Sequence, residues 1–467
     1  MDPDEEIAVL RERATTPPAS AALGRALGRK GELLIEAGQE IAAMAPLGEA
    51  AVIFDGLPAE YARDRAKVRA AIARAADQSG DVAGALVNWH RAAGIWRSLP
   101  LLDEERAGLA QCLNNAAVCH IRLRHEGSAL AAQEEAAAAA APLRAQRPDL
   151  YTTMHANLVR YLVGIDPARA VATAQRLAEE VPLPPSVGWD LHRAAEALGT
   201  HGRFAEAVAA CRLALRIEGD DLLRAALLKE LSADLADLGN HAEGADAAAA
   251  GVRAWRGVRT GMPEPQVRMN LATTLVNQAA NLRGMARHRE AAAVYGEAAT
   301  ELRALDLPDL LNDALSGAAR CHEEAEDLDA AVAVLRELVQ SSQGRTLASA
   351  LLSHARVLLK LHRAEEAFPS ASESVRVFHQ VLGDRPDTYE PEFASALFMT
   401  GMSLVYADRI AEATAPLVRS LGMAAAAEDR ASADSAMAAL HAARERDPRG
   451  VDAEWQRLTG FPFPSPA

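Results

Sequence analysis

The apolar positions of the chain recur with helical spacing, and short polar or glycine-containing turns interrupt them at regular intervals. The clearest copy runs from Leu198 to Val208, where a helical stretch ends, a turn containing Gly202 follows, and Phe-Ala-Glu-Ala begins a second helix. Apolar residues three and four positions apart predict amphipathic helices. We find no sustained alternation of β-branched or aromatic residues with polar ones, which would predict strands. The pattern therefore predicts an all-α protein built from helix pairs.

This two-helix phrase recurs along most of the chain, and each copy ends in a small residue that serves as a marker. The spacings between successive markers lie between 36 and 47 residues, with a mean of about 41. Such a period is typical of solenoids built from helix pairs. The markers are Ala43, Ala85, Ala129, Ala170, Ala207, Gly244, Ala291, Ala331, Ala367 and Ala413.

The markers predict how the chain is organised. We expect about ten helix pairs over residues 20–425, after an N-terminal segment (1–19) and before capping helices (426–457) and an extended tail (458–467). Proline-rich breaks at 181–185, 262–265 and 383–386 fall between pairs. Because proline restricts its own backbone and that of the preceding residue, we interpret these breaks as long inter-repeat loops rather than domain boundaries.

Three features of the phrase resemble the tetratricopeptide repeat: two small residues late in the first helix, a turn glycine, and an alanine early in the second helix. They stand here as Ala194-Ala195, Gly202 and Ala207. The segment Leu-Asn-Asn-Ala-Ala from Leu113 to Ala117 is similar to the long-helix form of kinesin light chains and actinobacterial relatives. The resemblance implies a right-handed α-α superhelix in which the first helix of each pair lines a concave groove.

The composition narrows the classes of partner and compartment. Half of the residues are hydrophobic but only 4% are aromatic. We therefore expect many small contacts between closely spaced helices rather than one large aromatic core. A net charge of -15 disfavours duplex nucleic acid as a partner. The first residues lack the basic-then-apolar order of a secretory signal, and no apolar run is long enough to span a membrane. We therefore expect a cytoplasmic protein whose four cysteines are reduced.

No catalytic, cofactor or metal motif meets its own requirements. The segment 24–31 has the wrong glycine spacing for a phosphate loop and lacks the required Ser or Thr. His322-Glu323-Glu324-Ala325-Glu326 lacks the second histidine of a zinc-protease helix. Cys119-His120 and Cys321-His322 have no accompanying CxxC, so small buried cysteines are the favoured interpretation. We therefore expect no enzyme, no cofactor and no metal.

The resemblance also implies which side chains face the groove. In this family, the residues 18, 15, 11, 8 and 7 positions before the marker point inward. Carried over to this chain, these positions give Arg25, Glu32, Glu36, Lys67, Arg74, Asp77, Asn114, Arg122, His192, Glu196, Lys229, Asp237, Arg283, Arg320, Glu323, Glu324, Arg356 and Lys360.

Four of these residues form a basic strip on an otherwise acidic chain: Arg283, Arg320, Arg356 and Lys360. A guanidinium group binds carboxylate or phosphate through two parallel hydrogen bonds. We therefore predict that the strip binds an acidic peptide or a chain-terminal carboxylate. The alternative is that these arginines pair with Glu323 and Glu324 and only hold adjacent repeats in register.

Three asparagines are predicted to hold the backbone of a bound peptide: Asn114, Asn115 and Asn277. The leading hypothesis is a non-catalytic adaptor or scaffold that binds a protein or peptide segment in its groove. A second hypothesis is a regulatory protein whose superhelix changes shape when a peptide or small molecule binds, with the proline-rich breaks as hinges. A third, an enzyme with an unrecognised groove site, has no motif in its favour. The sequence predicts neither the partner nor the oligomeric state.

Overall fold

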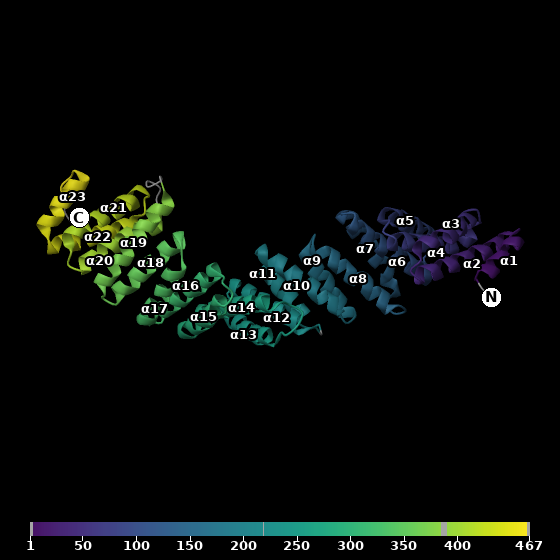
Figure 1. Cartoon of the computed structure of the whole chain (residues 1–467), viewed down its shortest axis with the longest axis horizontal. Coiled ribbons are helices and arrows are strands. Elements are labelled where there is room, and N and C mark those ends of the chain that lie inside the picture. Colours follow the sequence, from purple (N-terminus) through teal and green to yellow (C-terminus); the bar gives the residue numbers. More distant parts are fainter. Residues whose placement is uncertain (1–2, 218, 384–389, 465–467) are drawn as a thin grey trace. The chain divides into compact units, whose positions relative to one another are not determined.

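Every regular element of the described chain is a helix. The computed structural model describes residues 3–217, 219–383 and 390–464, and Figure 1 shows short helices that follow one another in chain order. No helix within those ranges combines the length and the apolar character that a bilayer span needs.

The helices of the described residues form ten pairs, with one helix before them and two after them. The first helix is α1 (Pro3–Arg13), and the last two are α22 (Arg430–Arg446) and α23 (Pro448–Thr459). The pairs are α2 (Pro17–Glu36) and α3 (Glu40–Asp55), α4 (Ala62–Gln78) and α5 (Val82–Ser98), α6 (Asp103–Arg122) and α7 (Glu126–Ala140), α8 (Pro148–Val163) and α9 (Pro167–Glu180), α10 (Pro185–Thr200) and α11 (Phe204–Ala214), α12 (Asp221–Asp237) and α13 (His241–Gly257), α14 (Glu264–Gly284) and α15 (His288–Arg303), α16 (Pro308–Glu324) and α17 (Leu328–Ser341), α18 (Gly344–Lys360) and α19 (Ala364–Leu382), and α20 (Pro391–Tyr406) and α21 (Ile410–Ala426).

The markers of the repeat occupy equivalent, fully buried positions. Each marker alanine lies in the first turns of the second helix of its pair and has an exposed fraction of 0%. At the remaining marker, Gly244, an added Cβ would lie 2.4 Å from the Asn281 side chain of α14. Small residues therefore allow neighbouring helices to approach closely, which confirms the predicted architecture of helix pairs.

The turn inside each pair closes with the same backbone geometry, except between α8 and α9. One residue takes positive φ, and the next residue donates its N–H to the carbonyl five positions earlier, as Gln39 does to Leu34 (2.8 Å). This is the Schellman helix ending, which favours glycine. Each of the nine turns of this kind has one residue with positive φ, and only four of these residues are glycine. The nine residues are Gly38, Gly80, Arg124, Gly202, Gly239, Ala286, Glu326, His362 and Asp408.

Ala286→Gly should stabilise the protein by about 0.5–1 kcal/mol. Ala286 has φ 57°, a conformation that costs a residue with a Cβ about 1–2 kcal/mol, and the greater freedom of glycine in the unfolded chain offsets only part of this gain. Thermal unfolding of both proteins measures the change. Ala333→Gly, in the exposed middle of α17, is the matched control and should lose about 1 kcal/mol. A lower melting temperature for Ala286→Gly would show that the turn does not carry this strain.

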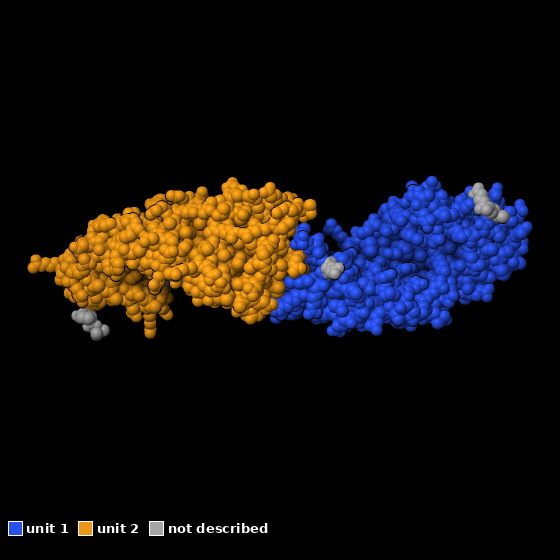
Figure 2. Space-filling view, turned by 90° about the horizontal axis from the view of Figure 1, so that it is seen from below, with its two compact units in different colours: residues 1–223 blue, residues 224–467 orange. Residues whose placement is uncertain are grey.

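The chain divides into two compact units, residues 1–223 and 224–467, a division that the repeat pattern did not predict (Figure 2). Of the three proline-rich breaks, the first lies between α9 and α10 and the second between α13 and α14, so neither coincides with the boundary of the units. The third lies largely outside the described residues, which resume at residue 390.

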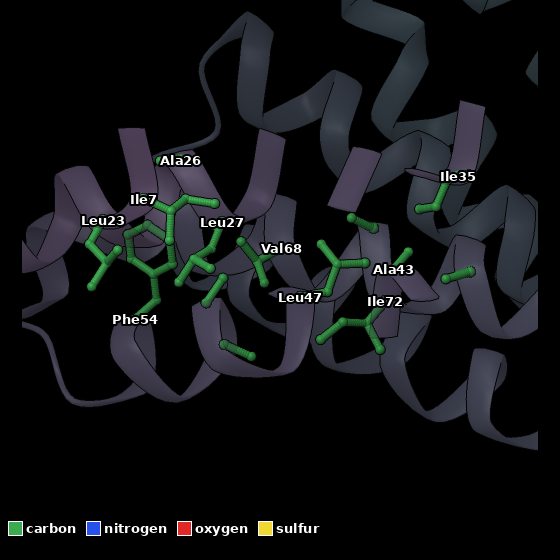
Figure 3. Packing of buried hydrophobic residues seen from close by; sticks show 14 of the residues in the cluster. Ile7, Leu23, Ala26, Leu27, Ile35, Ala43, Leu47, Phe54, Val68 and Ile72 are labelled. Carbon is green, nitrogen blue, oxygen red and sulfur yellow. The ribbon is translucent and has the colours of Figure 1, made fainter. Parts of the chain in front are cut away.

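The core of unit 1 illustrates how the helices pack (Figure 3). Leu27 of α2, Leu47 and Phe54 of α3 and Ile7 of α1 belong to one buried cluster. A Cβ at Gly31 would lie 2.4 Å from Cγ of Leu47, so the absence of a side chain there brings α2 against α3. Since α1 supplies Ile7 to this cluster, the predicted N-terminal segment includes a helix that covers the first pair.

The C-terminal end of unit 2 is covered in a similar way. The capping helices are α22 and α23, and α23 continues to Thr459, beyond the predicted start of the tail. The ring of Phe463 lies 4.9 Å from that of Trp455 and 5.1 Å from that of His441, measured between ring centroids. This part of the predicted extended tail therefore packs against the last helices, while 465–467 lie outside the described residues.

Candidate functional site

A trough in unit 1 is lined by several of the predicted groove residues. It consists of two adjoining cavities of about 780 Å³ and 250 Å³, and both are lined by Glu32 and Lys67. The walls come mainly from the first helices α2, α4, α6 and α8. We call these lining residues the unit-1 trough; its polar members include Arg25, Glu32, Lys67, Arg74, Glu104, Gln111, Asn114, Asn115, Arg147, Asp149 and Thr153.

The floor of the larger cavity is aromatic. Trp89 and Trp96, both on α5, line it and are 5% and 3% exposed. A Cβ at Gly108 would lie 2.5 Å from the indole ring of Trp96, so glycine is what lets α6 cross this ring. The trough therefore combines an apolar base with polar walls, a combination common in ligand sites.

Most of the charged side chains on the walls are already paired with the neighbouring repeat. Such exposed pairs contribute about 0–1 kcal/mol each, and they fix the register of α2, α4 and α6. Lys67 also lowers the pKa of Glu104 by donating a hydrogen bond to it. The pairs on the walls are Arg25–Asp64 (2.7 Å), Arg74–Glu32 (3.2 Å) and Lys67–Glu104 (2.8 Å). Outside the lining residues, Arg122 of α6 pairs with Asp77 of α4.

Two predicted backbone-binding residues lie together in the trough. Asn157 of α8 donates from Nδ2 to Oδ1 of Asn114 (2.8 Å), and Asn114 donates from Nδ2 to Oδ1 of Asn115 (3.5 Å). Within the described residues, the Nδ2 group of Asn115 has no acceptor. The amide row joins α6 to α8 and ends in this donor.

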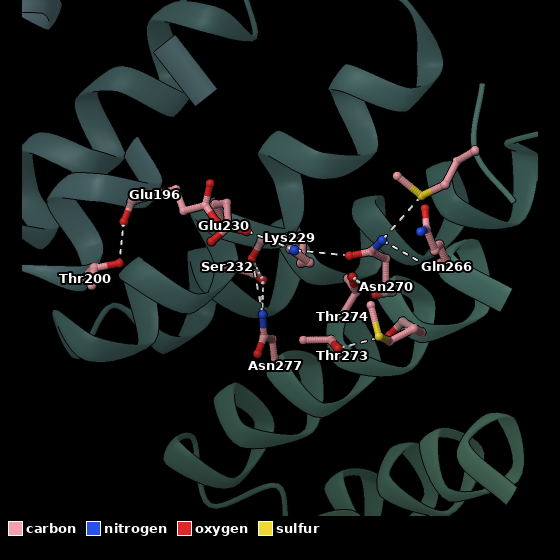
Figure 4. Close-up of polar contacts among 12 residues, drawn as sticks. Glu196, Thr200, Lys229, Glu230, Ser232, Gln266, Asn270, Thr273, Thr274 and Asn277 are labelled. Carbon is pink, nitrogen blue, oxygen red and sulfur yellow. Dashed lines mark hydrogen bonds and ion pairs between the residues drawn. The ribbon is translucent and has the colours of Figure 1, made fainter. Parts of the chain in front are cut away.

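Asn277, the third predicted asparagine, is engaged inside unit 2. Its Nδ2 group donates to the carbonyl oxygen of Lys229 (3.2 Å) and to Oγ of Ser232 (3.3 Å), both on α12 (Figure 4). Asn281, one turn later, donates to the carbonyl oxygen of Ser232 (3.0 Å). A ligand at Asn277 would therefore have to compete with contacts that hold α14 against α12.

The basic strip has two different halves. Arg356 and Lys360 of α18 each lie 2.7 Å from the same oxygen, Oε1 of Glu323 on α16. Arg283 and Arg320 have no ion pair or hydrogen bond with any other described residue. The alternative of pairing with Glu323 is thus realised for Arg356 and Lys360 only. Glu324 instead lies 3.0 Å from Nδ1 of His288.

The residues with reactive side chains are placed as structural groups. Cys112, Cys119, Cys211 and Cys321 are all buried, as predicted for small core residues, and none forms a disulfide with another described residue. Burial raises the pKa of Cys112 to about 12 and that of Cys119 to about 11, so neither supplies a thiolate at neutral pH. Over the described ranges, no three His, Cys, Asp or Glu side chains are arranged to hold a metal ion.

The groove pattern identified Arg25, Glu32, Lys67, Arg74 and Asn114, which all line the trough. Gln111 also lines it and lies 18 positions before its marker, so the same rule could have found it. No such rule identifies the two tryptophans of the floor, Trp89 and Trp96, because they lie on a second helix, α5. It also misses Arg147, which directly precedes α8, and Thr153, which occupies another position on α8.

No protein-family model and no curated protein matches the chain. Similar solved structures include the apo form of RapI, at 12% identity over 75% of this chain and 99% of that chain, with a TM-score of 0.43. A putative kinesin light chain from Podospora anserina with nearly identical tetratricopeptide-like repeats matches at 19% identity, 43% and 96% coverage and a TM-score of 0.34. YrrB, a tetratricopeptide protein with an unusual peptide-binding site, matches at 18% identity, 41% and 92% coverage and a TM-score of 0.25.

Proposed function

We propose that the protein binds an extended protein or peptide segment in the unit-1 trough and acts as a non-catalytic adaptor or scaffold. The observation that carries this proposal is the cavity of about 780 Å³ between the first helices of successive pairs. A cavity of this size is within the range of ligand sites. Its long wall of α2, α4, α6 and α8 suits a chain better than a compact small molecule.

The polar groups of the trough suit a peptide backbone. An extended segment presents unpaired N–H and C=O groups on both sides, and amide side chains can satisfy both kinds. Asn115 offers a free amide donor, and Gln111 and Thr153 are exposed on the facing helices α6 and α8. The aromatic floor then receives an apolar side chain of the segment.

In unit 2, the basic strip is the proposed contact for acidic groups or for a free C-terminus. Arg283 and Arg320 are the members without a partner among the described residues, and Arg356 and Lys360 share one carboxylate. Guanidinium groups on an otherwise acidic chain concentrate favourable potential for a negatively charged partner. Asn277 is a further proposed contact for the backbone of the segment. It would first have to break its hydrogen bond to the Lys229 carbonyl oxygen of α12.

Filling the trough tests the proposal. Gln111→Trp combined with Thr153→Trp places two large rings in the cavity at exposed positions, so we expect the variant to fold and to bind at least tenfold more weakly. Peptides selected from a random library on the full-length wild-type chain provide the probes, and fluorescence anisotropy measures their affinities. Ala131→Trp, at an exposed position of α7 outside the trough, is the control. Equal affinity of the filled variant and the wild type would exclude the trough as the binding site.

A further inference from the structure

Glu323 is the one carboxylate that forms ion pairs with the basic strip in the described part of the chain. Its Oε1 atom accepts from Nη1 of Arg356 and from Nζ of Lys360, each at 2.7 Å. The Glu323 side chain is only 10% exposed, whereas those of Arg356 and Lys360 are 45% and 50% exposed. The carboxylate therefore lies beneath the two cations, and their outer surfaces still face solvent.

The charges on the strip are unequally compensated. Arg356 and Lys360 share a single negative charge, so this half retains one net positive charge. Arg320 lies one turn before Glu323 on α16 and so faces the same side of that helix. It has no ion pair with a described residue. An incoming acidic group thus meets a free guanidinium beside a pair of cations that an internal carboxylate already occupies.

We propose that Glu323 is a specificity-determining residue of the strip, an inference that rests on its proposed role in binding acidic groups. The Glu323 carboxylate occupies the place between Arg356 and Lys360 that a single ligand carboxylate would take. A lone acidic group is therefore left with Arg320. A ligand with several adjacent acidic groups gains more, because one group pairs with Arg320 and the others contact the outer faces of Arg356 and Lys360.

The physical basis is competition between an internal and an external anion. A charge held about 4 Å from a cation in a solvated setting changes the interaction by about 1 kcal/mol, or about fivefold in affinity. Removing the charge of Glu323 frees both cations for one ligand carboxylate. Since Arg356 and Lys360 are half exposed, water solvates them when the carboxylate is lost, and folding is expected to survive the change.

The test compares two fluorescein-labelled probes with amidated C-termini, Gly-Glu-Glu-Glu and Gly-Gly-Gly-Glu, on the full-length chain at low salt. For the wild type we expect the three-acid probe to bind more tightly. Glu323→Gln should bind the one-acid probe about five- to tenfold more tightly and so reduce the preference. Glu323→Asp, which withdraws the carboxylate from both cations, should show an intermediate preference. Glu326→Gln, an exposed change in the turn after α16, is the control and should leave the preference unchanged.

The outcomes separate this inference from the proposed function. An unchanged preference in Glu323→Gln, together with weaker binding by Arg320→Gln, would overturn the role of Glu323 and leave the strip as an acid-binding site. If neither probe binds the wild type or Glu323→Gln, the acid-binding function of the strip fails and the inference fails with it. Circular dichroism of each variant confirms that the helices are intact.

Discussion

Leu47→Ala is expected to lower the free energy of unfolding of unit 1 by about 2–5 kcal/mol. Leu47 is fully buried between α2 and α3, and it packs in the cluster that also contains Leu27 and Phe54 (Figure 3). Truncating a buried leucine loses transfer free energy and leaves a cavity. Hydrogen exchange measures the effect locally, because in a helix-pair array the loss should concentrate in the pairs that share the contact. Leu33→Ala, 53% exposed on α2, is the control and should change little.

A second substitution makes this test specific to the close approach of the helices. Gly31→Ala alone adds a Cβ 2.4 Å from the Leu47 side chain, and overpacking of this kind costs about 1–3 kcal/mol. In the Leu47→Ala background, the same Cβ enters the vacated space. We therefore expect the double variant to lose clearly less than the sum of the two single changes. Additive losses would mean that Gly31 and Leu47 do not share one interface.

Asp234→Asn is expected to stabilise the protein at pH 8 and to have almost no effect at pH 4. Burial is the main cause that raises the pKa of Asp234 to about 7, and the charges of Glu230 and Asp237 add to it. The side chain is 6% exposed. An unfolded aspartate titrates near 3.9, so the folded state binds the extra proton between these pH values. The protonated Asp234 side chain therefore contributes stability that is fully present below about pH 4. This stability is lost as the pH rises from about 4 through about 7.

The size of the Asp234 effect follows from the same pKa difference. The gap between about 3.9 and about 7 corresponds to about 4 kcal/mol, and we expect about 2–4 kcal/mol at pH 8 after relaxation of the site. Urea unfolding of wild type and variant from pH 4 to pH 8 measures it. Asp313→Asn, an exposed change on α16, should give no such pH dependence. A difference that stays constant with pH would contradict the raised pKa.

The sequence predicts the repeat well because the interface needs one small residue at a fixed place. Each marker alanine proved fully buried, and each predicted turn lies between the helices of a pair. The groove positions implied by the tetratricopeptide resemblance include Arg25, Glu32, Lys67, Arg74 and Asn114, and all five line the trough. Such a pattern can be carried over because residues at fixed helical spacing share one face. Helix pairing and facing direction are local properties, and a periodic sequence carries them.

The partners of these side chains could not be predicted in the same way. The resemblance implies that Glu323 and Lys360 both face the groove. The sharing of one carboxylate oxygen by Arg356 and Lys360 depends in addition on rotamers and on the distance between α16 and α18. Likewise, Asn277 satisfies groups of α12, which no pattern within its own repeat encodes. At Ala286 the fold imposes a left-handed backbone conformation although the residue is not glycine, so the sequence alone does not indicate this conformation.

The site of contact with a bound segment tests the central claim most directly. A photo-crosslinking amino acid is placed at position 153 or position 111 in the trough, or at position 131 on the exposed side of α7, in the otherwise unchanged full-length chain. Each protein is then irradiated with a library-selected peptide, and the crosslinked product is quantified by mass spectrometry. We predict strong crosslinking from positions 153 and 111 and almost none from position 131. Equal or stronger crosslinking from position 131 would contradict the assignment of the trough as the binding face.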